Sequence, residues 1–526
     1  MLLLPKCVEQ FAASYAVLLS GGAYMPADIS YTASEIGCCI EKADIKAIIT
    51  NRSLSSGIPD DFSGNILIIE DIDLNDCEGF IPRKTLPKDR SILINTSGTT
   101  GRPKSVILSS SVLVNCLDYT PVFCSAERGD TLLALTNYCH DMAIFDTLGQ
   151  FFYGGCTVIP DEQQAREPKA WIELINKYNV DLWESVPSFM EMLMAYAETE
   201  KKAVRFEGFK TIMHGGETLK PTVAKFITEA FPNVTLYNVG GPSESTIWSI
   251  FHKVTEDDIA DTIPYGIPLP NIRWHVFNDK YEECPCGTIG TLYVSGSSLS
   301  DGYIGNPEET NAKFTYNNGI RYYNTGDIGF RRRDGELVIL GRNDFQVKIH
   351  GKRIELAGIE SILESHCNIL KACVIFTEKL GKLCAVYTST EKIQKDELDS
   401  YLKSRLADYQ LPRLLVKVDT IPLSRNGKAD RKAIERILLE QISKEHKTKD
   451  SNSSCSCTVK NKIIEIFEDE LDCDINDGNE NFYEIGGNSL SAVKIAAKLN
   501  QLIDSDISVF DIINSESINK FIESLN

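Results

Sequence analysis

The chain has 526 residues, a formal net charge of −20, and 43% hydrophobic and 24% charged residues. This composition is typical of a globular protein, and the length suffices for about two to four domains with separate cores. The acidic balance disfavours nucleic acid as a partner, because neutralising phosphates requires a basic surface. No apolar run reaches the roughly 18 residues of a membrane span, so we expect a cytoplasmic protein without a membrane partner.

The N-terminal segment is apolar, but Lys6, Glu9 and Gln10 interrupt it and no basic segment precedes it. This pattern predicts an amphipathic helix and not a signal peptide. The sixteen cysteines lack the C-x-x-C spacing of a zinc or redox pair, which predicts reduced thiols.

From about 12 to 340, apolar runs typical of buried strands alternate with amphipathic helical stretches, which predicts an α/β domain. After Gly341 an alternating strand followed by a helix predicts a smaller α+β domain that runs to about 440. The polar, Ser/Lys-rich stretch at 443–457 predicts a flexible linker. The remaining residues have helical periodicity, which predicts a small helical bundle. Because this segment carries fourteen acidic and five basic residues from 458 to 526, it suits docking on a basic partner.

The string TSGTTGRPK at 96–104 follows an apolar strand and predicts a phosphate-binding loop. Small residues let backbone N–H groups approach an anion, hydroxyls add donors, and Lys104 supplies positive charge. It lacks the Gly-Lys-Ser/Thr of the Walker pattern, which disfavours a P-loop NTPase. The alternative is a flexible polar loop with a chance lysine.

Further motifs stand in order around this loop: LLSGGAYMPADISY at 18–31, NVGGPSESTIW at 238–248, YYNTGDIGF at 322–330, GRNDFQVKIHGKRIELAGIE at 341–360, PLSRNGKADRKAI at 422–434 and FYEIGGNSLSAVKI at 482–495. Together they resemble an adenylation domain of a nonribosomal peptide synthetase, from the adenylate-forming superfamily, fused to a peptidyl carrier domain.

The resemblance implies an α/β fold with a large adenylate-forming N-terminal domain, a small α+β lid domain and a four-helix carrier bundle. The implied bounds are 1–341 for the large domain, 342–442 for the lid, 443–457 for the linker and 458–526 for the carrier. In the family the motif at 18–31 lies well inside the large domain, so tens of N-terminal residues of that domain are expected to be missing.

The resemblance also assigns roles in catalysis and nucleotide binding. Glu244 is expected to bind Mg²⁺, Asp327 the ribose hydroxyls, and Lys428 the substrate carboxylate and α-phosphate. Asp344 is the expected hinge between adenylation and thiolation. The implied nucleotide-binding residues are Thr96, Ser97, Gly98, Thr99, Thr100, Gly101, Lys104, Gly241, Ser243, Asp327 and Arg342.

Each of these residues has a plainer interpretation when it is taken alone. Asp327 could cap a turn, Arg342 could form a surface ion pair, and Lys428 could be a solvated loop lysine.

Two positions depart from the family pattern. Gly240 stands where most relatives have a tyrosine that stacks on adenine. His140 replaces a phenylalanine, and we expect the imidazole ring to pack in place of the phenyl ring.

The segment at 136–155 resembles the part of the family that lines the amino-acid pocket, and it places Asp141 where an aspartate pairs with the substrate α-ammonium. A buried ammonium needs a carboxylate, although Asp141 could instead cap a helix. By the same resemblance the side chain of the substrate is contacted by Met142, Phe145, Glu184, Met213, Gly215, Val239, Ile247 and Trp248.

This predicted lining leaves little volume, which implies a small side chain. The lining and the string NVGGPSESTIW resemble those of family members that select cysteine or glycine, which we therefore rank first, with serine or a small basic amino acid behind them. Glu184 is the discordant residue, because its carboxylate could meet a thiol, a hydroxyl or an amine. An ionised and unpaired carboxylate there would cost several kcal/mol.

Ser489 follows two glycines and an asparagine and precedes a helical apolar period. By composition alone, a helix cap is as good an interpretation of Ser489 as a functional serine. The resemblance makes it the attachment site of a phosphopantetheine arm, whose thiol attacks the aminoacyl adenylate. A phosphopantetheinyl transferase is then a partner, and so are condensation or other downstream synthetase proteins in trans.

The implied activity is that of an amino-acid adenylating, AMP-forming ligase with carrier-protein thioesterification, in nonribosomal peptide biosynthesis. Its substrates are an amino acid and ATP, and its cofactors are ATP, Mg²⁺ and 4′-phosphopantetheine. One alternative is an acyl- or aryl-CoA ligase of the same fold. Another is an inactive truncated relic that acts only as a carrier or docking partner.

Overall fold

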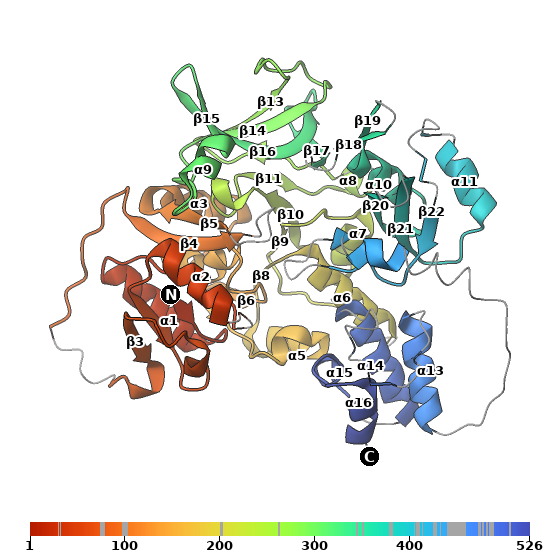
Figure 1. Ribbon diagram of the computed structural model, residues 1–526, viewed down its shortest axis with the longest axis horizontal. Coiled ribbons are helices and arrows are strands. Elements are labelled where there is room, and N and C mark those ends of the chain that lie inside the picture. The colour runs from red at the N-terminus through yellow and green to blue at the C-terminus, as the bar shows by residue number, and fades with distance from the viewer. Residues whose placement is uncertain are drawn as a thin grey trace. The chain divides into compact units, whose positions relative to one another are not determined.

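The computed structural model consists of two compact units, Met1–Met194 with Ala203–Ile339, and Ala195–Lys202 with Leu340–Asn526 (Figure 1). The domain bounds predicted at 341, 442 and 457 stay predictions. The structure describes residues 1–526 except 30, 32, 74–78, 97–103, 200–203, 261–262, 343–345, 350–351, 378–381, 404, 407–410, 413, 424–428, 432, 439–458, 472–474, 476–477, 480–481, 483–488, 504–506 and 526.

A seven-stranded sheet lies at the centre of the first unit, in the order β12-β11-β10-β9-β8-β6-β7 (Figure 1). The five strands from β7 to β10 run parallel, and β11 and β12 extend the sheet in antiparallel fashion. Most of the parallel strands are buried, as expected when both faces of a sheet are covered, and this confirms the α/β prediction. The bounds are β6 Thr131–Ala134, β7 Cys156–Val158, β8 Leu182–Ser185, β9 Thr211–His214, β10 Thr235–Gly240, β11 Ile250–Lys253 and β12 Ile267–Pro268.

The two faces of the central sheet bury different side chains, because successive residues of a strand point to opposite sides. On one face the ring of Trp183 contacts Trp171 of α5 (Pro168–Tyr178) edge-on, with 6.0 Å between the ring centroids. Glu184 is the next residue of β8 and points to the other face, beside its neighbour Met213 in β9. The second face is the one that carries the predicted pocket residues.

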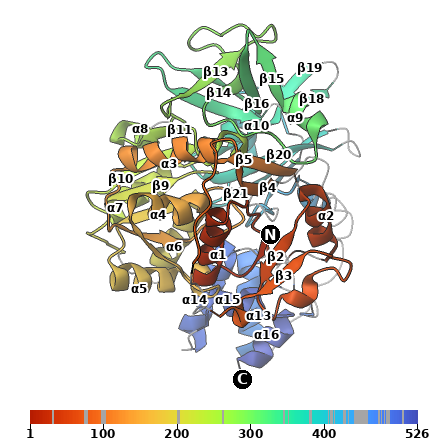
Figure 2. The same cartoon turned by 90° about the vertical axis from the view of Figure 1, so that its left-hand side faces the viewer.

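Three smaller sheets accompany the central one. The strands β1 (Leu2–Leu3), β2 (Ala47–Thr50) and β3 (Asn65–Ile68) form a parallel sheet, on which α2 (Ala33–Ala43) packs (Figure 2). The strands β4 (Arg90–Thr96) and β5 (Lys104–Ser109) pair antiparallel. A five-stranded sheet has the order β13-β14-β16-β15, with β17 paired to β16. Its bounds are β13 Ile272–Phe277, β14 Gly290–Gly296, β15 Phe314–Asn317, β16 Ile320–Arg331 and β17 Leu337–Arg342.

The helix α1 (Val8–Leu19) confirms the helix predicted for the N-terminal segment. Among the residues that the structure describes, none of the helices has the length and apolar character needed to span a membrane. The other helices of this part are α3 Ser110–Cys124, α4 Gln150–Tyr153, α6 Pro187–Thr199, α7 Pro221–Ala230, α8 Glu256–Ala260 and α9 Pro307–Lys313.

The second unit opens with the antiparallel pair β18 (Gln346–Ile349) and β19 (Lys352–Glu355), followed by α10 (Leu356–Glu364). The strands β20 (Ile369–Thr377), β21 (Lys382–Ser389) and β22 (Leu414–Lys417) form a sheet, and α11 spans Lys395–Lys403. Strands followed by a helix open this unit, as predicted. Glu360 of α10 accepts hydrogen bonds from Val374 N–H and from the Arg431 guanidinium, both at 2.8 Å, which ties the helix to β20.

The C-terminal residues form helices α13 (Val459–Leu471), α14 (Ser489–Ile503), α15 (Val509–Ile513) and α16 (Ile518–Ser524). Phe467, Phe482 and Phe521 meet edge-on and are buried among them. The structure therefore confirms a helical C-terminal segment, and the helix count predicted for the complete bundle stays a prediction.

Candidate active site

The predicted substrate residues converge at the carboxyl ends of the parallel strands, where ligands bind in open α/β sheets. Those after β6 lie on a loop and on the π-helical turn η3 (Phe145–Gly149), a kind of turn that is frequent at functional sites. The others lie in or directly after β8, β9 and β10 and around the turn η5 (Ser243–Ser245). All of them are buried: Asp141, Met142, Phe145, Glu184, Met213, Gly215, Val239, Ile247 and Trp248.

Asp141 is a buried carboxylate that the surrounding residues keep ionised. His140 Nδ1 lies 2.8 Å from its Oδ1, and the Ser243 side chain is hydrogen-bonded to it. Burial alone raises the pKa of Asp141, but the charge and hydrogen bond of His140 and the hydrogen bond of Ser243 together hold this pKa below its usual range. His140 thus contacts Asp141 directly instead of packing as an aromatic substitute.

The apolar part of the predicted pocket is closely packed. The rings of Phe145 and Trp248 meet edge-on with 5.5 Å between centroids, and Trp248 Nε1 donates to Thr120 Oγ1 at 2.7 Å. A Cβ atom added to Gly215 would lie 2.8 Å from the Val239 carbonyl oxygen. A side chain at position 215 would therefore collide with β10, so this wall requires glycine.

Glu184 belongs to a buried polar cluster that includes Lys6, Thr136 and Asp146. Thr136 Oγ1 donates to Glu184 Oε2 at 3.1 Å, and the Glu184 and Asp146 side chains are hydrogen-bonded to each other. Lys6 Nζ lies 3.4 Å from Asp146 Oδ2. Burial raises the pKa of Glu184 well above its usual range, and the negative charge of Asp146 raises it further.

The described residues of the predicted phosphate-binding loop are Thr96 at the end of β4 and Lys104 at the start of β5. Thr96 Oγ1 donates to the Lys104 carbonyl oxygen at 3.2 Å, and the Lys104 ammonium is paired with Glu309 of α9. The same ammonium lies 5.7 Å from the centroid of the Tyr303 ring. Tyr303 Oη in turn donates to Glu244 Oε1 at 2.5 Å. The structure therefore brings Lys104 and Glu244 to one place, with Tyr303 between them.

Tyr265 occupies the space beside Gly240. A Cβ atom added to Gly240 would lie 2.1 Å from Tyr265 Cε2, which is impossible without movement. The Tyr265 side chain is hydrogen-bonded to the Gly241 backbone and lies within electrostatic range of both Asp141 and Asp327. Burial raises its pKa, and the charge of Asp327 raises it further, so the phenol stays protonated. An aromatic side chain from another segment thus takes the space that a side chain at position 240 would use.

The remaining residues predicted for the site lie on other elements or outside the described part of the chain. Arg342 is the last residue of β17 and Ser489 the first residue of α14. Asp327 lies in β16, where its backbone N–H donates to Thr325 Oγ1 at 3.0 Å. Outside the described residues lie Ser97, Gly98, Thr99, Thr100, Gly101, Asp344 and Lys428.

Four residues of this region were not predicted from the sequence: Lys6, Asp146, Tyr265 and Tyr303. Each contacts a predicted site residue or its neighbour from a distant part of the chain. Lys6 offered a signal, since a lysine that interrupts an apolar segment needs a buried partner. The two tyrosines carried none, because they stand in no motif.

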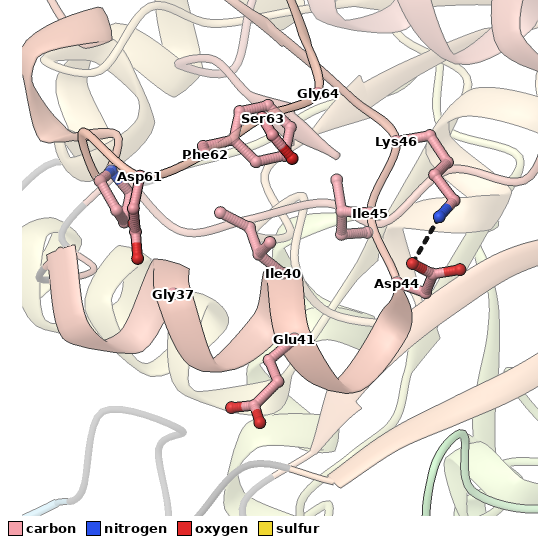
Figure 3. Close-up of a pocket in the computed structure, with 11 residues that line it drawn as sticks. Gly37, Ile40, Glu41, Asp44, Ile45, Lys46, Asp61, Phe62, Ser63 and Gly64 are labelled. Atoms are coloured by element: carbon pink, nitrogen blue, oxygen red, sulfur yellow. Dashed lines mark hydrogen bonds and ion pairs between the residues drawn. The ribbon is translucent and has the colours of Figure 1, made fainter.

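A separate surface pocket of about 610 Å³ lies between α2 and the segment that leads to β3 (Figure 3). Ile40, Ile45 and Phe62 form its apolar part. Its charged pair Lys46–Asp44, 2.5 Å apart, is exposed and does not point to a ligand. We assign this pocket no part in the site.

Known families match the chain over most of its length. AMP-binding enzymes match residues 1–304, which is more than half of the chain. The chain belongs to the AMP-binding enzyme family. The AMP-binding enzyme C-terminal domain matches residues 358–428, and the phosphopantetheine attachment site matches residues 461–525. These matches confirm the prediction of an adenylation domain fused to a carrier domain.

Individual relatives agree with this assignment. The chain is 28% identical over 531 residues to gramicidin S synthase 2 of Brevibacillus brevis, across 98% of this chain and 12% of that protein. It is 31% identical over 441 residues to zwittermicin A synthase ZmaJ of Bacillus cereus, across 82% of this chain and 84% of that protein. This chain thus spans only a small part of the first relative and most of the second.

A solved structure supports the fold over the full chain. The holo-AB3403 protein, a four-domain nonribosomal peptide synthetase bound to AMP and glycine, matches with a TM-score of 0.69 and 27% identity. The match covers 100% of this chain and 38% of that one. The chain therefore combines an AMP-binding enzyme domain with a carrier domain, and the predicted cofactors ATP, Mg²⁺ and 4′-phosphopantetheine are those of its families.

The packing of Tyr265 on Gly240 predicts a steric coupling between these two positions. Gly240→Tyr should lower the free energy of unfolding by about 1–3 kcal/mol, because the new side chain and Tyr265 cannot share one space. Adding Tyr265→Ala should restore most of this loss. Denaturant unfolding of the two single variants and the double variant measures the coupling energy.

Gly208→Tyr is the matched control, because a Cβ atom there meets no atom within 4 Å. It should change the free energy of unfolding by no more than about 0.5 kcal/mol. If Gly240→Tyr is as harmless as this control while Tyr265 is present, the packing described here is wrong.

Proposed function

We propose that the chain activates a small α-amino acid with ATP to an aminoacyl adenylate, and then loads it as a thioester on the phosphopantetheine arm of its own C-terminal domain. The observation that carries the proposal is Asp141, a buried carboxylate held ionised at the carboxyl edge of the central sheet. A substrate α-ammonium would compensate its charge in this position. A fatty or aryl acid has no ammonium and would leave that carboxylate without its substrate partner.

The other end of the site is suited to a nucleotide. Lys104 carries a positive charge whose partner, Glu309, can be replaced by a phosphate. Glu244 offers a buried carboxylate, and such oxygen ligands are the ones that Mg²⁺ prefers. A bound Mg²⁺ would offset negative charge on the departing pyrophosphate. Tyr303 holds the Glu244 carboxylate in place through its hydroxyl, whose pKa burial raises.

The remaining roles follow from the family resemblance. We infer that Lys428 contacts the substrate carboxylate and the α-phosphate, where its charge stabilises the transition state of adenylate formation. Asp344 is the proposed hinge about which the lid turns before thiolation. Ser489, at the start of α14, is the proposed attachment site of the arm. A phosphopantetheinyl transferase and downstream synthetase proteins in trans are the proposed partners.

The packing of the pocket supports a small substrate side chain, with cysteine or glycine favoured. The rings of Phe145 and Trp248 pack edge-on against each other, and a Cβ atom added to Gly215 would collide with the β10 backbone. Close packing of this kind leaves no room for a bulky group without movement. The related synthetase structure solved with AMP and glycine supports the same size class.

Amino-acid-dependent exchange of pyrophosphate into ATP tests the proposed function directly. Cysteine or glycine should give the highest rate, and Lys428→Ala should remove most of it, because the charge that stabilises the transition state is lost. Lys392→Ala is the matched control, since this exposed lysine of the same unit has no proposed role. Dependence on free coenzyme A with acyl or aryl acids would favour the CoA ligase instead. Absence of exchange with every acid would leave a protein that acts only as a carrier or docking partner.

Asp141→Asn tests the amino-acid assignment separately. It should raise KM for the amino acid by about 10–100-fold, because a charge-assisted contact of about 1.5–3 kcal/mol is lost. KM for ATP should change little, since Asp141 serves the α-ammonium. Asp118→Asn, an exposed position on α3, is the matched control. An equal loss of affinity for both substrates would show that Asp141 acts on the fold of the whole site.

The carrier assignment makes its own prediction. Co-expression with a broad-specificity phosphopantetheinyl transferase should add one phosphopantetheine arm, detected by intact mass. Ser489→Ala should abolish the addition, because the accepting hydroxyl is gone, while Ser524→Ala on the exposed side of α16 should keep it. Modification of the Ser489→Ala variant would contradict the assignment.

A further inference from the structure

One lysine lies near two buried carboxyl groups beside the predicted pocket. Lys6 Nζ donates to the carbonyl oxygens of Ala134 and Thr136, at 2.7 and 2.5 Å, and pairs with Asp146 at 3.4 Å. An ammonium has three donor hydrogens, so these contacts use all of them. Asp146 and Glu184 are both completely buried. The ammonium therefore ties the end of β6 to η3 and has no donor left for Glu184.

The cluster needs a bound proton to be neutral, because it contains two buried carboxyl groups and one ammonium. An ionised carboxyl group is very costly to bury without a partner of opposite charge, and here a single cation faces two carboxyl groups. Asp146 has Lys6, whereas Glu184 accepts from the Thr136 hydroxyl at its Oε2. Within the described part of the chain, the oxygens Asp146 Oδ1 and Glu184 Oε1 have no other donor. A proton held by Glu184 and shared with Asp146 satisfies both oxygens and makes the cluster neutral.

We propose that Lys6 and Asp146 are positioning residues: Lys6 holds Asp146 ionised, and Asp146 accepts the proton of Glu184, so that Glu184 stays a neutral carboxylic acid beside the pocket and the site accepts amino acids with uncharged side chains and rejects basic ones. The proposal rests on the proposed function, because it names the class of side chain that the adenylation site admits. It assigns a role to two residues outside the predicted pocket lining.

The consequence for the substrate follows from the charges that face it. Among the predicted lining residues only Asp141 and Glu184 are acidic. With Glu184 neutral and its oxygens engaged, Asp141 is the single anion available to an ammonium. An amino acid then binds in one orientation, with its α-ammonium at Asp141, and a second ammonium on the side chain would be buried among apolar groups such as Met213 without a counterion.

Infrared spectroscopy tests the protonation state without any substrate. At about pH 8 exposed carboxyl groups are ionised, so a carboxylic-acid carbonyl band reports buried protonated groups. The band should be present in the wild-type protein and weaker in Glu184→Gln. Asp130→Asn should leave it unchanged, because Asp130 is buried but has its own lysine, Lys210, at 2.5 Å. A wild-type protein without the band, or a band unaffected by Glu184→Gln, would overturn the proposal.

Exchange kinetics test the effect on specificity, with glycine and cysteine compared with diaminopropionate and ornithine. Glu184→Gln should keep the preference of the wild type within about threefold, since a neutral side chain of the same shape replaces a neutral acid. Lys6→Met removes the counterion of Asp146, and a buried carboxylate without a counterion takes up a proton, so the carboxylic-acid band at about pH 8 should become stronger than in the wild type. Lys6→Met/Asp146→Asn leaves Glu184 as the protonated group of the cluster, so the band should return to about its wild-type strength.

These outcomes separate the inference from the proposed function. If no amino acid supports exchange in the wild type, the proposed function fails, and the infrared measurement still decides the state of Glu184. If exchange occurs but Glu184→Gln lowers kcat/KM for a basic amino acid relative to a neutral one by about tenfold, Glu184 acts as an anion and the inference fails alone. The same holds if Lys6→Met leaves the carboxylic-acid band unchanged, or if the double variant does not return it to its wild-type strength. A merely structural role of Lys6 would lower all rates together.

Discussion

Burial of charge at the carboxyl edge of the central sheet is the constraint on which the rest of this site depends. Asp141, Glu184 and Glu244 all lie buried there. A buried carboxyl group without donors costs several kcal/mol, which is a large share of the about 5–15 kcal/mol that stabilise a typical domain. Each of the three groups therefore has its own partners, and each is stabilised in a different way.

The three buried carboxyl groups differ in what they offer to a ligand. Asp141 stays ionised through His140 and Ser243, so it offers a negative charge. Glu244 is held by the hydroxyl of Tyr303 and offers carboxylate oxygens. Glu184 faces a second carboxyl group and offers a neutral surface. Three acidic residues on one edge thus suit the proposed ammonium site, the proposed cation site and an uncharged wall, because their neighbours differ.

Motif order and periodicity were enough to predict the fold class, and the structure buries the residues predicted to line the site near one another, while their roles stay predictions. The α/β sheet, the lid strands and the C-terminal helices follow from periodicity, and the buried lining around Asp141 follows from resemblance. Spacing could not reveal Lys6 or Tyr265, since their contacts join segments more than a hundred and about twenty-five residues apart. His140 was misjudged for a related reason, because its pairing with Asp141 depends on side-chain direction and not on residue type.

The two ends of the site are joined by consecutive residues. Ser243 is hydrogen-bonded to Asp141, and the next residue, Glu244, accepts from Tyr303 beside Lys104. The turn η5 carries both residues, so a single peptide unit separates the hydrogen-bond partner of Asp141 from Glu244. Because packed turns of this kind do not deform freely, the proposed amino-acid and cation positions would be set together. That coupling suits a reaction in which a substrate carboxylate must meet a phosphate in line, where a small misplacement is costly.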